Sequence, residues 1–506
     1  MIAMLEAVAI ANPDAVAVES PGECLTYRAL WHAVCRLRSK IESVEATDLP
    51  VAVLLPVGAA YVVAIFAVLA ARRICLLLDH GYPDDRNAAI AAAAGVDMVL
   101  TPLGTGGEFA WPGVVRLGTD DAFDIAIPAI PPTHAPLALD EPAYILCTSG
   151  STGLPKSIVH SQRTLLHWVR TVVDAMHLTP EDRALTISSP STLAGLVPLL
   201  ACPLTGASTQ MLDIRSVGFG DFLDVLATRP VSILRVAPSF ARALARVPGA
   251  ASAATRLRLV QLSGEPVLKS DITEIRKFLP SHCLIRSTYG STEASGLSWF
   301  AGEPDDFDPL RSSTGVLMPE TSAMIVDDDG RACAVGEAGE LIIRSRYNSL
   351  GEWKDGNIES TMFDPDLSDG SARAYRTGDV ARFHAEGVFV VLGRKGRMLK
   401  INGQRVEPAE VEAVLRRSHE IAEVEVLGHR RTDASIMIAF VVPRAGAAPN
   451  LATRLIADLR TVLPRFMVPS RIIVLPAMPR LPGGKVDGQQ LLSLADECHE
   501  PPDRAP

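Results

Sequence analysis

Short runs rich in β-branched residues alternate with longer alanine- and leucine-rich segments over roughly the first 390 residues. Clear examples of the short runs are DMVLT at 97–101, RALTIS at 183–188, VSILRVAP at 231–238 and LRLVQLSG at 257–264. Strands that alternate with helices form parallel sheets with helices on both faces. The alternation therefore predicts an α/β fold for most of the chain.

The pattern changes near residue 394, where we expect a domain boundary. At 506 residues the chain exceeds the size at which one hydrophobic core keeps growing. The charged stretch GRKGR at 393–397 precedes a predicted strand, a turn at Asn402 and Gly403, and a helix from about Pro408. We predict domains at 1–393 and 394–495, the second a small α+β unit, and a disordered tail at 496–506.

Composition and charge narrow the class of protein. The net charge of -10 argues against a surface for nucleic acid or an anionic membrane. The 8 cysteines lack metal-binding spacing and no secretory signal opens the chain, which predicts a cytoplasmic protein. The uncharged stretch 51–71 has the length of a membrane span, but Pro56 and Gly58 interrupt it. A buried strand at 51–55 and a buried helix at about 59–72 explain it better.

A loop of small and hydroxyl-bearing residues follows the apolar run in YILCTSGSTGLPKSIVH at 144–160. Small residues let backbone N–H groups approach a polyanion, and serine and threonine hydroxyls add donors. The loop is no Walker A motif, because Gly153 and Lys156 are separated by two residues. Taken alone, the run is more typical of a flexible surface turn than of a phosphate cradle.

Six motifs in a fixed order favour the phosphate cradle. They are TSGSTGLPK at 148–156, YGSTE at 289–293, GELII at 339–343, YRTGDV at 375–380, GRKGRMLKINGQRVEPAEVE at 393–412 and LPGGKVDGQQL at 481–491. Together they resemble the adenylate-forming superfamily of acyl-CoA synthetases, luciferases and adenylation domains of nonribosomal peptide synthetases. The segment 69–101 is more similar to the peptide-synthetase branch. The resemblance implies a large N-terminal domain of parallel-rich sheets sandwiched by helices, with a β-barrel-like part, and a small mobile C-terminal α+β domain.

The family reaction uses ATP to convert a carboxylate to acyl-AMP and pyrophosphate, and then passes the acyl group to a thiol. Both reactants are anionic, so the site needs cations, amides and Mg²⁺. By resemblance, Thr292 contacts the α-phosphate and Glu293 binds Mg²⁺. The expected contacts to the β- and γ-phosphates are Thr148, Ser149, Gly150, Ser151, Thr152, Gly153 and Lys156.

The resemblance also implies the nucleoside contacts. Tyr289 would stack on adenine, Asp379 would accept hydrogen bonds from the ribose, and Arg394 would reach the ribose or phosphate side. Without the ordered motifs, Asp379 would be interpreted as a turn residue after Gly378. The further expected cofactor-binding residues are Ser291, Gly264 and Glu265.

The small domain is expected to supply the catalytic lysine and the hinge. Lys485 would bridge the substrate carboxylate and the α-phosphate, as the matching family lysine does. Gly396 occupies the hinge position, where the family usually has Asp or Lys, and glycine permits wide backbone excursions. Lys400 and Gly403 would face the thiolation side.

The substrate pocket departs from that of amino-acid-activating relatives. Their Phe-Asp pair, whose Asp binds the α-ammonium, is matched by Thr192 and Leu193. An unpaired buried ammonium costs several kcal/mol, so we expect an acid without a free α-amino group, and a polar or dicarboxylic acid is one candidate. Arg235 could pair with a second substrate carboxylate or face solvent at a strand end. The predicted pocket residues are Leu193, Val197, Arg235, Gln261, Ser263, Thr288, Gly296 and Leu297.

Three functions compete. The favoured one is an ATP- and Mg²⁺-dependent acid–thiol ligase that loads a separate carrier protein, because nothing after residue 491 resembles a carrier domain. Such a chain is a stand-alone enzyme or an excised domain. The second is a ligase that uses free coenzyme A. The third is a non-catalytic binding module, since Leu193, Ser157 and Gly396 all depart from the family pattern.

Overall fold

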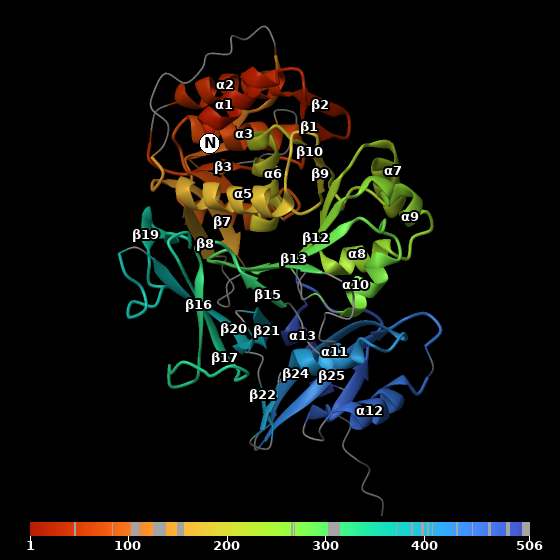
Figure 1. Ribbon diagram of the computed structural model, residues 1–506. Coiled ribbons are helices and arrows are strands. Elements are labelled where there is room, and N and C mark those ends of the chain that lie inside the picture. Colours follow the sequence, from red (N-terminus) through yellow and green to blue (C-terminus); the bar gives the residue numbers. More distant parts are fainter. Residues whose placement is uncertain are drawn as a thin grey trace, which may run out of the picture.

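The computed structural model describes most of the chain. The described residues are 1–44, 47–82, 84–102, 111, 113–124, 138–148, 156–264, 267, 269–301, 314–370, 372–385, 388–395, 399–401, 404–406, 408–431, 434–447, 449–463, 467–481 and 486–497. Figure 1 shows the N-terminal elements at one end of an elongated molecule and the C-terminal elements at the other. The predicted mixed α/β architecture with a small C-terminal unit is confirmed.

The first sheet has 13 strands and carries most of the predicted site. Six neighbouring strands from β1 to β13 are parallel, and the strands from β14 to β16 continue the sheet in antiparallel fashion. In spatial order the strands are β16 (Ser322–Val326), β17 (Gly339–Ser345), β20 (Arg373–Ala385), β21 (Val388–Arg394), β15 (Thr314–Leu317), β14 (Ser295–Ala301), β13 (Leu284–Gly290), β12 (Leu259–Ser263), β11 (Ile233–Val236), β9 (Arg183–Thr186), β10 (Ser208–Met211), β1 (Val16–Ser20) and β2 (Glu23–Thr26).

The second sheet has 8 strands and contains the hairpin between β7 and β8 that carries the hydroxyl-rich loop. Its strands β3 to β7 are parallel, and β8, β18 and β19 are added in antiparallel fashion. In spatial order the strands are β19 (Asn357–Glu359), β18 (Gly351–Lys354), β8 (Lys156–Ser161), β7 (Pro142–Thr148), β4 (Cys75–Leu77), β3 (Val51–Val53), β5 (Met98–Thr101) and β6 (Val115–Gly118).

Helices fill the space between the two sheets and cover their outer faces. The central core joins both sheets through α1 (Ile2–Ala11), α2 (Tyr27–Glu42), α3 (Ala59–Ala70), α5 (Gln162–Met176) and α6 (Leu193–Thr205). A second core packs the other face of the first sheet against α7 (Phe219–Thr228), α8 (Pro238–Leu244), α9 (Ala250–Ala253) and α10 (Lys269–Arg276). Helix α4 (Asp84–Ala93) covers the outer face of the second sheet, and two short 3-10 turns lie at Asp120–Phe123 and Ala254–Arg256.

The uncharged stretch 51–71 folds as predicted, into strand β3 followed by helix α3. Every residue of α3 except Ala60 is buried, because the helix lies inside the central core. A helix buried on all sides needs no polar face. No helix of the described part of the chain is both long and apolar enough to cross a membrane.

The resemblance implied a β-barrel-like part without assigning residues to it. In the described residues the antiparallel part of the first sheet is an open extension with its own small core, and β16 forms its edge. Strand β21 ends at Arg394, so the predicted boundary between 393 and 394 falls where the large sheet ends. The boundary itself stays a prediction.

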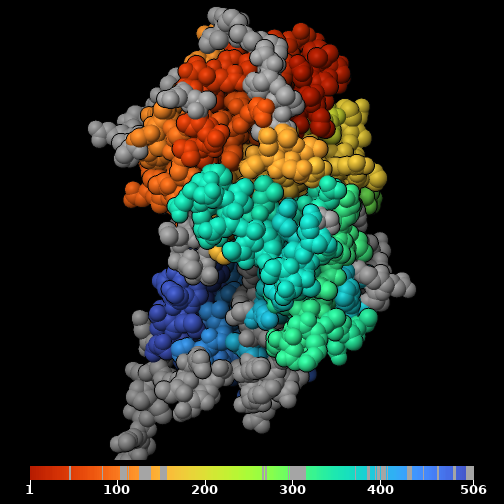
Figure 2. All heavy atoms as spheres, turned by 90° about the vertical axis from the view of Figure 1, so that its left-hand side faces the viewer, coloured from red at the N-terminus to blue at the C-terminus, as the bar shows by residue number. Residues whose placement is uncertain are grey.

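The segment from residue 399 onward forms sheets and cores of its own. Strands β22 (Leu399–Ile401) and β23 (Gln404–Val406) make a hairpin, and β24 (Ile421–Arg431), β25 (Ala434–Pro443) and β26 (Arg471–Val474) make a second sheet. They pack with α11 (Pro408–Leu415), α12 (Leu451–Val462) and α13 (Gly488–Glu497). Figure 2 shows this C-terminal unit at one end of the molecule. Helix α13 continues two residues into the predicted tail, and 498–506 lie outside the described residues.

Candidate active site

A contact between two distant motifs marks the nucleotide side of the candidate site. The hydroxyl of Tyr289, near the end of β13, donates a hydrogen bond to Oδ2 of Asp379 on β20, 90 residues later in the chain. The backbone N–H of Asp379 donates to Oγ1 of Thr377 at 3.0 Å, and Asp379 lies opposite Arg394 in the β20–β21 ladder. The structure therefore brings together three of the predicted nucleoside contacts.

Two glycines of the predicted site occupy positions that disfavour a side chain. A Cβ at Gly296 would stand 2.8 Å from both Cδ1 and the carbonyl oxygen of Tyr289, so only glycine fits against that ring. Gly296 was predicted to line the acid pocket, and the structure places it against the Tyr289 ring. Gly264 follows β12 with φ +87°, a left-handed conformation that favours glycine.

The YGSTE motif forms a tight turn after β13. Ser291 N–H donates to the carbonyl oxygen of Ala294 at 2.9 Å, and Ala294 N–H donates to Oγ of Ser291 at 3.2 Å. The carbonyl oxygen of Glu293 accepts from Ser349 N–H at 2.9 Å. The half-buried carboxylate of Glu293 has no hydrogen bond or ion pair with any residue that the structure describes. It is thus available to a cation.

The hydroxyl-rich loop closes the hairpin between β7 and β8. Thr148 and Lys156 pair across the two strands at the base of this loop, and Lys156 is exposed. Ser157, at the usual glycine position, is buried with its Oγ 3.7 Å from Cys147 Sγ. The predicted phosphate contacts at 149–153 lie outside the described residues, so their roles stay predictions.

His160 was not singled out by sequence reasoning. It is fully buried on β8, with its ring stacked on Tyr144 at 4.9 Å between centroids and tilted against Trp168 at 5.0 Å. Burial lowers the pKa of His160 to about 3, and the charge of Arg373 adds to this. This neutral histidine packs β8, the strand after the loop, against β7 and α5.

The substrate side begins at helix α6. Thr192 caps the helix, because its Oγ1 accepts from Gly195 N–H at 3.2 Å. Leu193, the first helical residue, is half-buried, and Val197 is buried one turn later. Leu193, which takes the place of the aspartate that binds the α-ammonium in amino-acid-activating relatives, therefore lies at the start of a helix that faces the first sheet.

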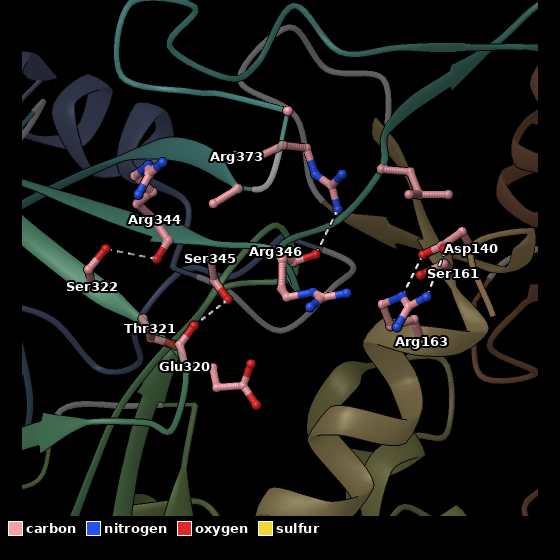
Figure 3. A pocket seen from close by; sticks show the side chains of 13 residues that line it. Asp140, Ser161, Arg163, Glu320, Thr321, Ser322, Arg344, Ser345, Arg346 and Arg373 are labelled. Carbon is pink, nitrogen blue, oxygen red and sulfur yellow. Dashed lines mark hydrogen bonds and ion pairs between the residues drawn. The ribbon is translucent and has the colours of Figure 1, made fainter.

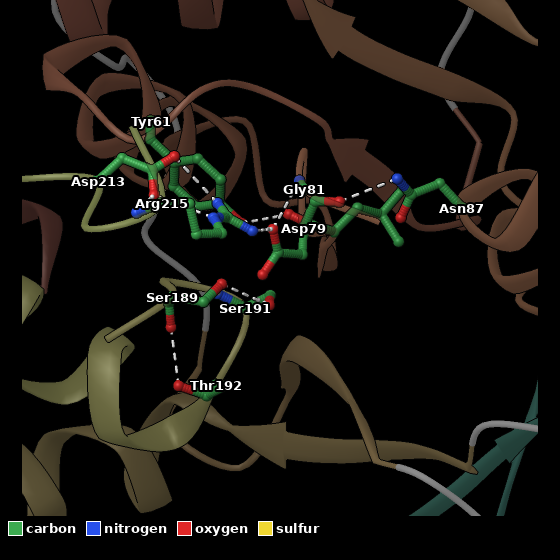
Figure 4. A network of polar contacts seen from close by, with 10 residues as sticks. Tyr61, Asp79, Gly81, Asn87, Ser189, Ser191, Thr192, Asp213 and Arg215 are labelled. Carbon is green, nitrogen blue, oxygen red and sulfur yellow. Dashed lines mark hydrogen bonds and ion pairs between the residues drawn. The ribbon is translucent and has the colours of Figure 1, made fainter. Parts of the chain in front are cut away.

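Asp79 at the end of β4 is the carboxylate that reaches the segment before α6 (Figure 4). Burial alone would raise the pKa of Asp79, but hydrogen bonds from Arg215, Ser189 and the Gly81 N–H lower it overall. Arg215 Nη1 lies 2.6 Å from Oδ1 of Asp79. Because Asp79 is already paired with the guanidinium of Arg215, its carboxylate is poorly suited to bind the α-ammonium of an amino-acid substrate in place of the missing aspartate.

A transverse row of polar side chains crosses the parallel strands beside α6. Thr186, Arg235, Gln261 and Arg286 lie directly opposite one another on β9, β11, β12 and β13. Arg235 is 4% exposed, Gln261 2% and Arg286 1%. The alternative in which Arg235 faces solvent is therefore wrong. Arg286 was not singled out from the sequence, although a charge in the otherwise apolar start of LIRSTYG is an unusual signal.

Hydrogen bonds join this row to the nucleotide side. Arg286 Nη1 donates to Gln261 Oε1 at 2.6 Å, and Gln261 Nε2 donates to Thr288 Oγ1 at 2.9 Å. Thr288 directly precedes Tyr289 in β13. Ser263 and Thr288, which pair across β12 and β13, are half-buried and lie at the rim above the row. Predicted pocket residues are thus brought together next to predicted nucleotide residues.

Several predicted residues cannot be placed. Lys485 lies outside the described residues, and in the sequence it falls between Arg480 and Val486, which form a β-bridge. The other predicted residues outside the described part of the chain are Glu265, Gly396 and Gly403, together with the side chains of Leu297, Arg394 and Lys400. Their roles stay predictions.

A cavity of about 740 Å³ lies elsewhere, where α5 meets β16 and β17 (Figure 3). It is lined by charged side chains that pair with one another, such as Arg163, whose Nη2 lies 2.8 Å from Asp140 Oδ2. Arg373 donates to the carbonyl oxygen of Arg346 at 3.2 Å. None of the predicted site residues that the structure describes lines this cavity, so it is distinct from the described part of the candidate active site.

The tyrosine–aspartate contact lies at the carboxyl end of the parallel strand β13, which is the edge of an α/β sheet where ligands bind. The sequence pattern described as "AMP-binding enzyme" matches residues 5–353, and that described as "AMP-binding enzyme C-terminal domain" matches 410–485. The chain therefore belongs to the AMP-binding enzyme family, which confirms the predicted adenylate-forming superfamily. Membership supports the prediction of an AMP-forming ligase.

Two relatives and one structure illustrate the similarity. Phosphinothricin tripeptide synthetase PhsC of Streptomyces viridochromogenes is 32% identical over 499 residues, which cover 96% of this chain and 44% of that protein. Novobiocin biosynthesis protein H of Streptomyces niveus is 29% identical over 490 residues, 94% of this chain and 79% of that protein. The structure of O-succinylbenzoate coenzyme A synthetase from Bacillus subtilis with ATP and magnesium has a TM-score of 0.82 and 21% identity, and covers 96% of this chain and 98% of that chain.

The chain spans less than half the length of the first curated relatives, 44%, 33% and 6%. At 21% identity the B. subtilis enzyme establishes the fold alone. The part of the chain that the structure describes holds no cluster of three or more His, Cys, Asp or Glu residues that could bind a metal. Mg²⁺ is typically held by one or two carboxylates together with substrate phosphates, so the unpaired carboxylate of Glu293 fits this ion.

Proposed function

We propose that this chain uses ATP to adenylate a carboxylic acid and transfers the acyl group to the phosphopantetheine thiol of a separate carrier protein in secondary-metabolite biosynthesis. The observation that carries the proposal is the hydrogen bond from Tyr289 to Asp379, because it unites two of the ordered motifs at the carboxyl end of β13. The names of the two relatives, a peptide synthetase and an antibiotic biosynthesis protein, support the biosynthetic setting.

In the first step one carboxylate oxygen bonds to the α-phosphorus of ATP, and the bond from that phosphorus to its bridging oxygen breaks to release pyrophosphate. Lys485 and Thr292 would stabilise the charge at the α-phosphate, and Lys156 that of the departing phosphates. Mg²⁺ held by Glu293 would neutralise part of the phosphate charge. In the second step a thiolate bonds to the acyl carbon and AMP leaves.

The substrate in this proposal has no free α-amino group. Leu193 stands where amino-acid-activating relatives place the carboxylate, and the neighbouring Asp79 is bound by Arg215. A buried ammonium without a partner costs several kcal/mol. The pocket instead offers the positive charges of Arg235 and Arg286.

Pyrophosphate exchange tests the adenylation step. The purified chain is incubated with ATP, Mg²⁺ and ³²P-labelled pyrophosphate, and with one member at a time of a broad library of α-amino, hydroxy, aryl and aliphatic acids. We expect exchange with acids that lack an α-amino group and little with common α-amino acids. The proposal fails if no acid supports exchange, and its substrate part fails if α-amino acids alone do.

The acceptor distinguishes carrier loading from coenzyme A ligation. Once an acid is known, the enzyme is offered free coenzyme A or a carrier protein that bears phosphopantetheine, and the acyl products are measured by mass spectrometry. Acylation of the carrier at low micromolar concentration, with little acyl-coenzyme A, is the expected result. Efficient acylation of coenzyme A and none of the carrier would favour the second function.

A further inference from the structure

The guanidinium of Arg235 is buried without enough protein partners. Its Nη2 donates to the carbonyl oxygen of Ala194 in the first turn of α6 at 3.2 Å. Neither Nε nor Nη1 has a hydrogen-bond partner in the described chain, and no described carboxylate forms an ion pair with this arginine. Buried cations are normally paired, because desolvating an unpaired charge is expensive.

A second cation lies close to Arg235 on the same face of the sheet. Arg286 is two strands away and in direct register through Gln261. Adjacent strands are spaced by about 4.8 Å, so the Cα atoms of the two arginines lie roughly 10 Å apart. Burial lowers the pKa of Arg235 to about 9, and the charge of Arg286 contributes. The row thus concentrates positive charge in a poorly solvated place.

The row lies just inside the end of the sheet that faces the nucleotide side. In β11, β12 and β13 the row residue is buried, whereas the residue two positions later, Ala237, Ser263 or Thr288, is half-buried. Two residues of a strand span about 6.6 Å, so the backbone of Arg235 lies about that far from the half-buried ends of these strands. Half-buried Leu193 on α6 faces the same region. An anion that enters past Thr288 would meet Arg235.

We propose that the acid activated by this enzyme is a dicarboxylic acid, whose second carboxylate binds Nε and Nη1 of Arg235 between α6 and strands β11–β13. Gln261 lies next to Arg235 in the row, and Arg286, which donates to Gln261, is the second positive charge. Nε and one Nη of an arginine fit both oxygens of a carboxylate at once. The carboxylate that reacts with ATP lies nearer Thr292, and the second carboxylate is unchanged by the reaction. This inference rests on the proposed adenylation.

The test compares each diacid with its own monomethyl ester. The ester keeps the shape and one reactive carboxylate but removes the second charge. Pyrophosphate exchange is measured for the purified chain with aliphatic diacids of increasing length, with aromatic diacids, and with the matching esters. We expect the best diacid to exceed its ester in kcat/KM by about 30-fold or more, because the ester leaves the buried charge unpaired.

Variants then assign the preference to Arg235. Arg235→Leu is expected to reduce the ratio of diacid to ester at least about tenfold, and Arg235→Lys to retain part of it because the charge remains. Arg170→Leu is the matched control, since Arg170 is exposed on α5, where it pairs with Asp174 at 3.5 Å, and it should leave the ratio unchanged. If Arg235→Leu does not fold, the decision rests on the parent enzyme and Arg235→Lys.

The outcomes separate this inference from the proposed function. If monocarboxylic acids or monoesters support exchange as well as every diacid or better, the dicarboxylic substrate is overturned. Adenylation then still stands. A diacid preference that survives unchanged in Arg235→Leu overturns the role of this residue. Absence of exchange with every acid overturns adenylation itself, and the inference falls with it.

Discussion

At the scale of single residues, Asp379 combines two interactions that explain its place in the site. Its Oδ2 accepts the hydrogen bond of Tyr289, and its backbone N–H is held by Thr377. Gly296 packs against the same tyrosine ring and excludes any Cβ there. The carboxylate is thereby fixed at the carboxyl end of β13, where a ribose hydroxyl could share it.

We predict that Asp379→Ala raises the KM for ATP about tenfold or more, since a charge-assisted hydrogen bond to the nucleotide would be lost. Asp379→Asn keeps an acceptor oxygen and should have a smaller effect. The measurement is pyrophosphate exchange against ATP concentration at a saturating acid concentration. An unchanged KM for ATP in Asp379→Ala would mean that this carboxylate serves the fold alone.

A second residue-scale prediction concerns Lys485. Its ammonium is expected to hold the substrate carboxylate against the α-phosphate only during adenylation. Lys485→Ala should therefore reduce exchange by at least about a hundredfold, yet spare transfer of the acyl group from synthetic acyl-AMP to the thiol acceptor. Equal exchange rates in variant and parent would contradict this role. Arg480→Ala, at the edge of the same loop, is the control.

At the scale of elements, His160 connects β7, β8 and α5 through its stacked and tilted ring contacts. Burial keeps its ring neutral in the folded protein, where its pKa is lowered to about 3. In the unfolded chain an ordinary histidine takes up a proton below pH about 6.5. The unfolded state therefore binds more protons as the pH falls, and the folded state loses stability.

We predict that His160 contributes its full stabilising effect above pH 6.5 and that this contribution falls by about 1.4 kcal/mol for each pH unit well below that value. His160→Phe keeps an aromatic ring for stacking but cannot titrate. Its free energy of unfolding should depend less steeply on pH between 6.5 and 4.5 than that of the parent, as urea denaturation would measure. His282→Gln, at an exposed position, should keep the slope of the parent. Parallel slopes for His160→Phe and the parent would refute the prediction.

The elements themselves were largely predictable from local sequence. Alternating apolar residues such as Leu234 and Val236, or Val260 and Leu262, face the second core, and the breaks at Pro56 and Gly58 separate β3 from α3. These signals are local, since they depend on the periodicity of a strand or helix. The open antiparallel extension was not predictable in detail, because the strand order in a sheet depends on pairings between distant segments.

Site residues could be predicted from the sequence where they belong to one of the six ordered motifs. Tyr289, Asp379 and Glu293 were found from their motifs, and their proximity needed the structure. Arg286 and His160 were missed because neither belongs to such a motif. The direct register of Arg235 with Gln261 and Arg286 is a property of the sheet, and no local pattern encodes it.

At the scale of the whole molecule, the chain is anchored immediately before the predicted hinge. Lys395 follows β21, and its Nζ lies 3.1 Å from Glu340 Oε2 and 3.5 Å from Asp328 Oδ1. Cores on the two sides of this point share no residues, since the cores beyond residue 399 are built from C-terminal elements alone. A rotation between the two parts would therefore require few core contacts to break.

We predict that Gly396→Pro changes the ratio of adenylation to thiol transfer about tenfold or more, because proline fixes φ near −65° and permits only one of two backbone conformations at a pivot. Gly396→Ala should change the ratio less, since alanine retains more of the allowed φ range. Adenylation is followed by pyrophosphate exchange, and transfer by the acylation of the thiol acceptor from synthetic acyl-AMP. Gly356→Ala, in the turn between β18 and β19, is the control for a glycine replacement in the large domain. If Gly396→Pro retains both half-reactions in the ratio of the parent, the pivot lies at another residue of the segment that joins β21 to β22.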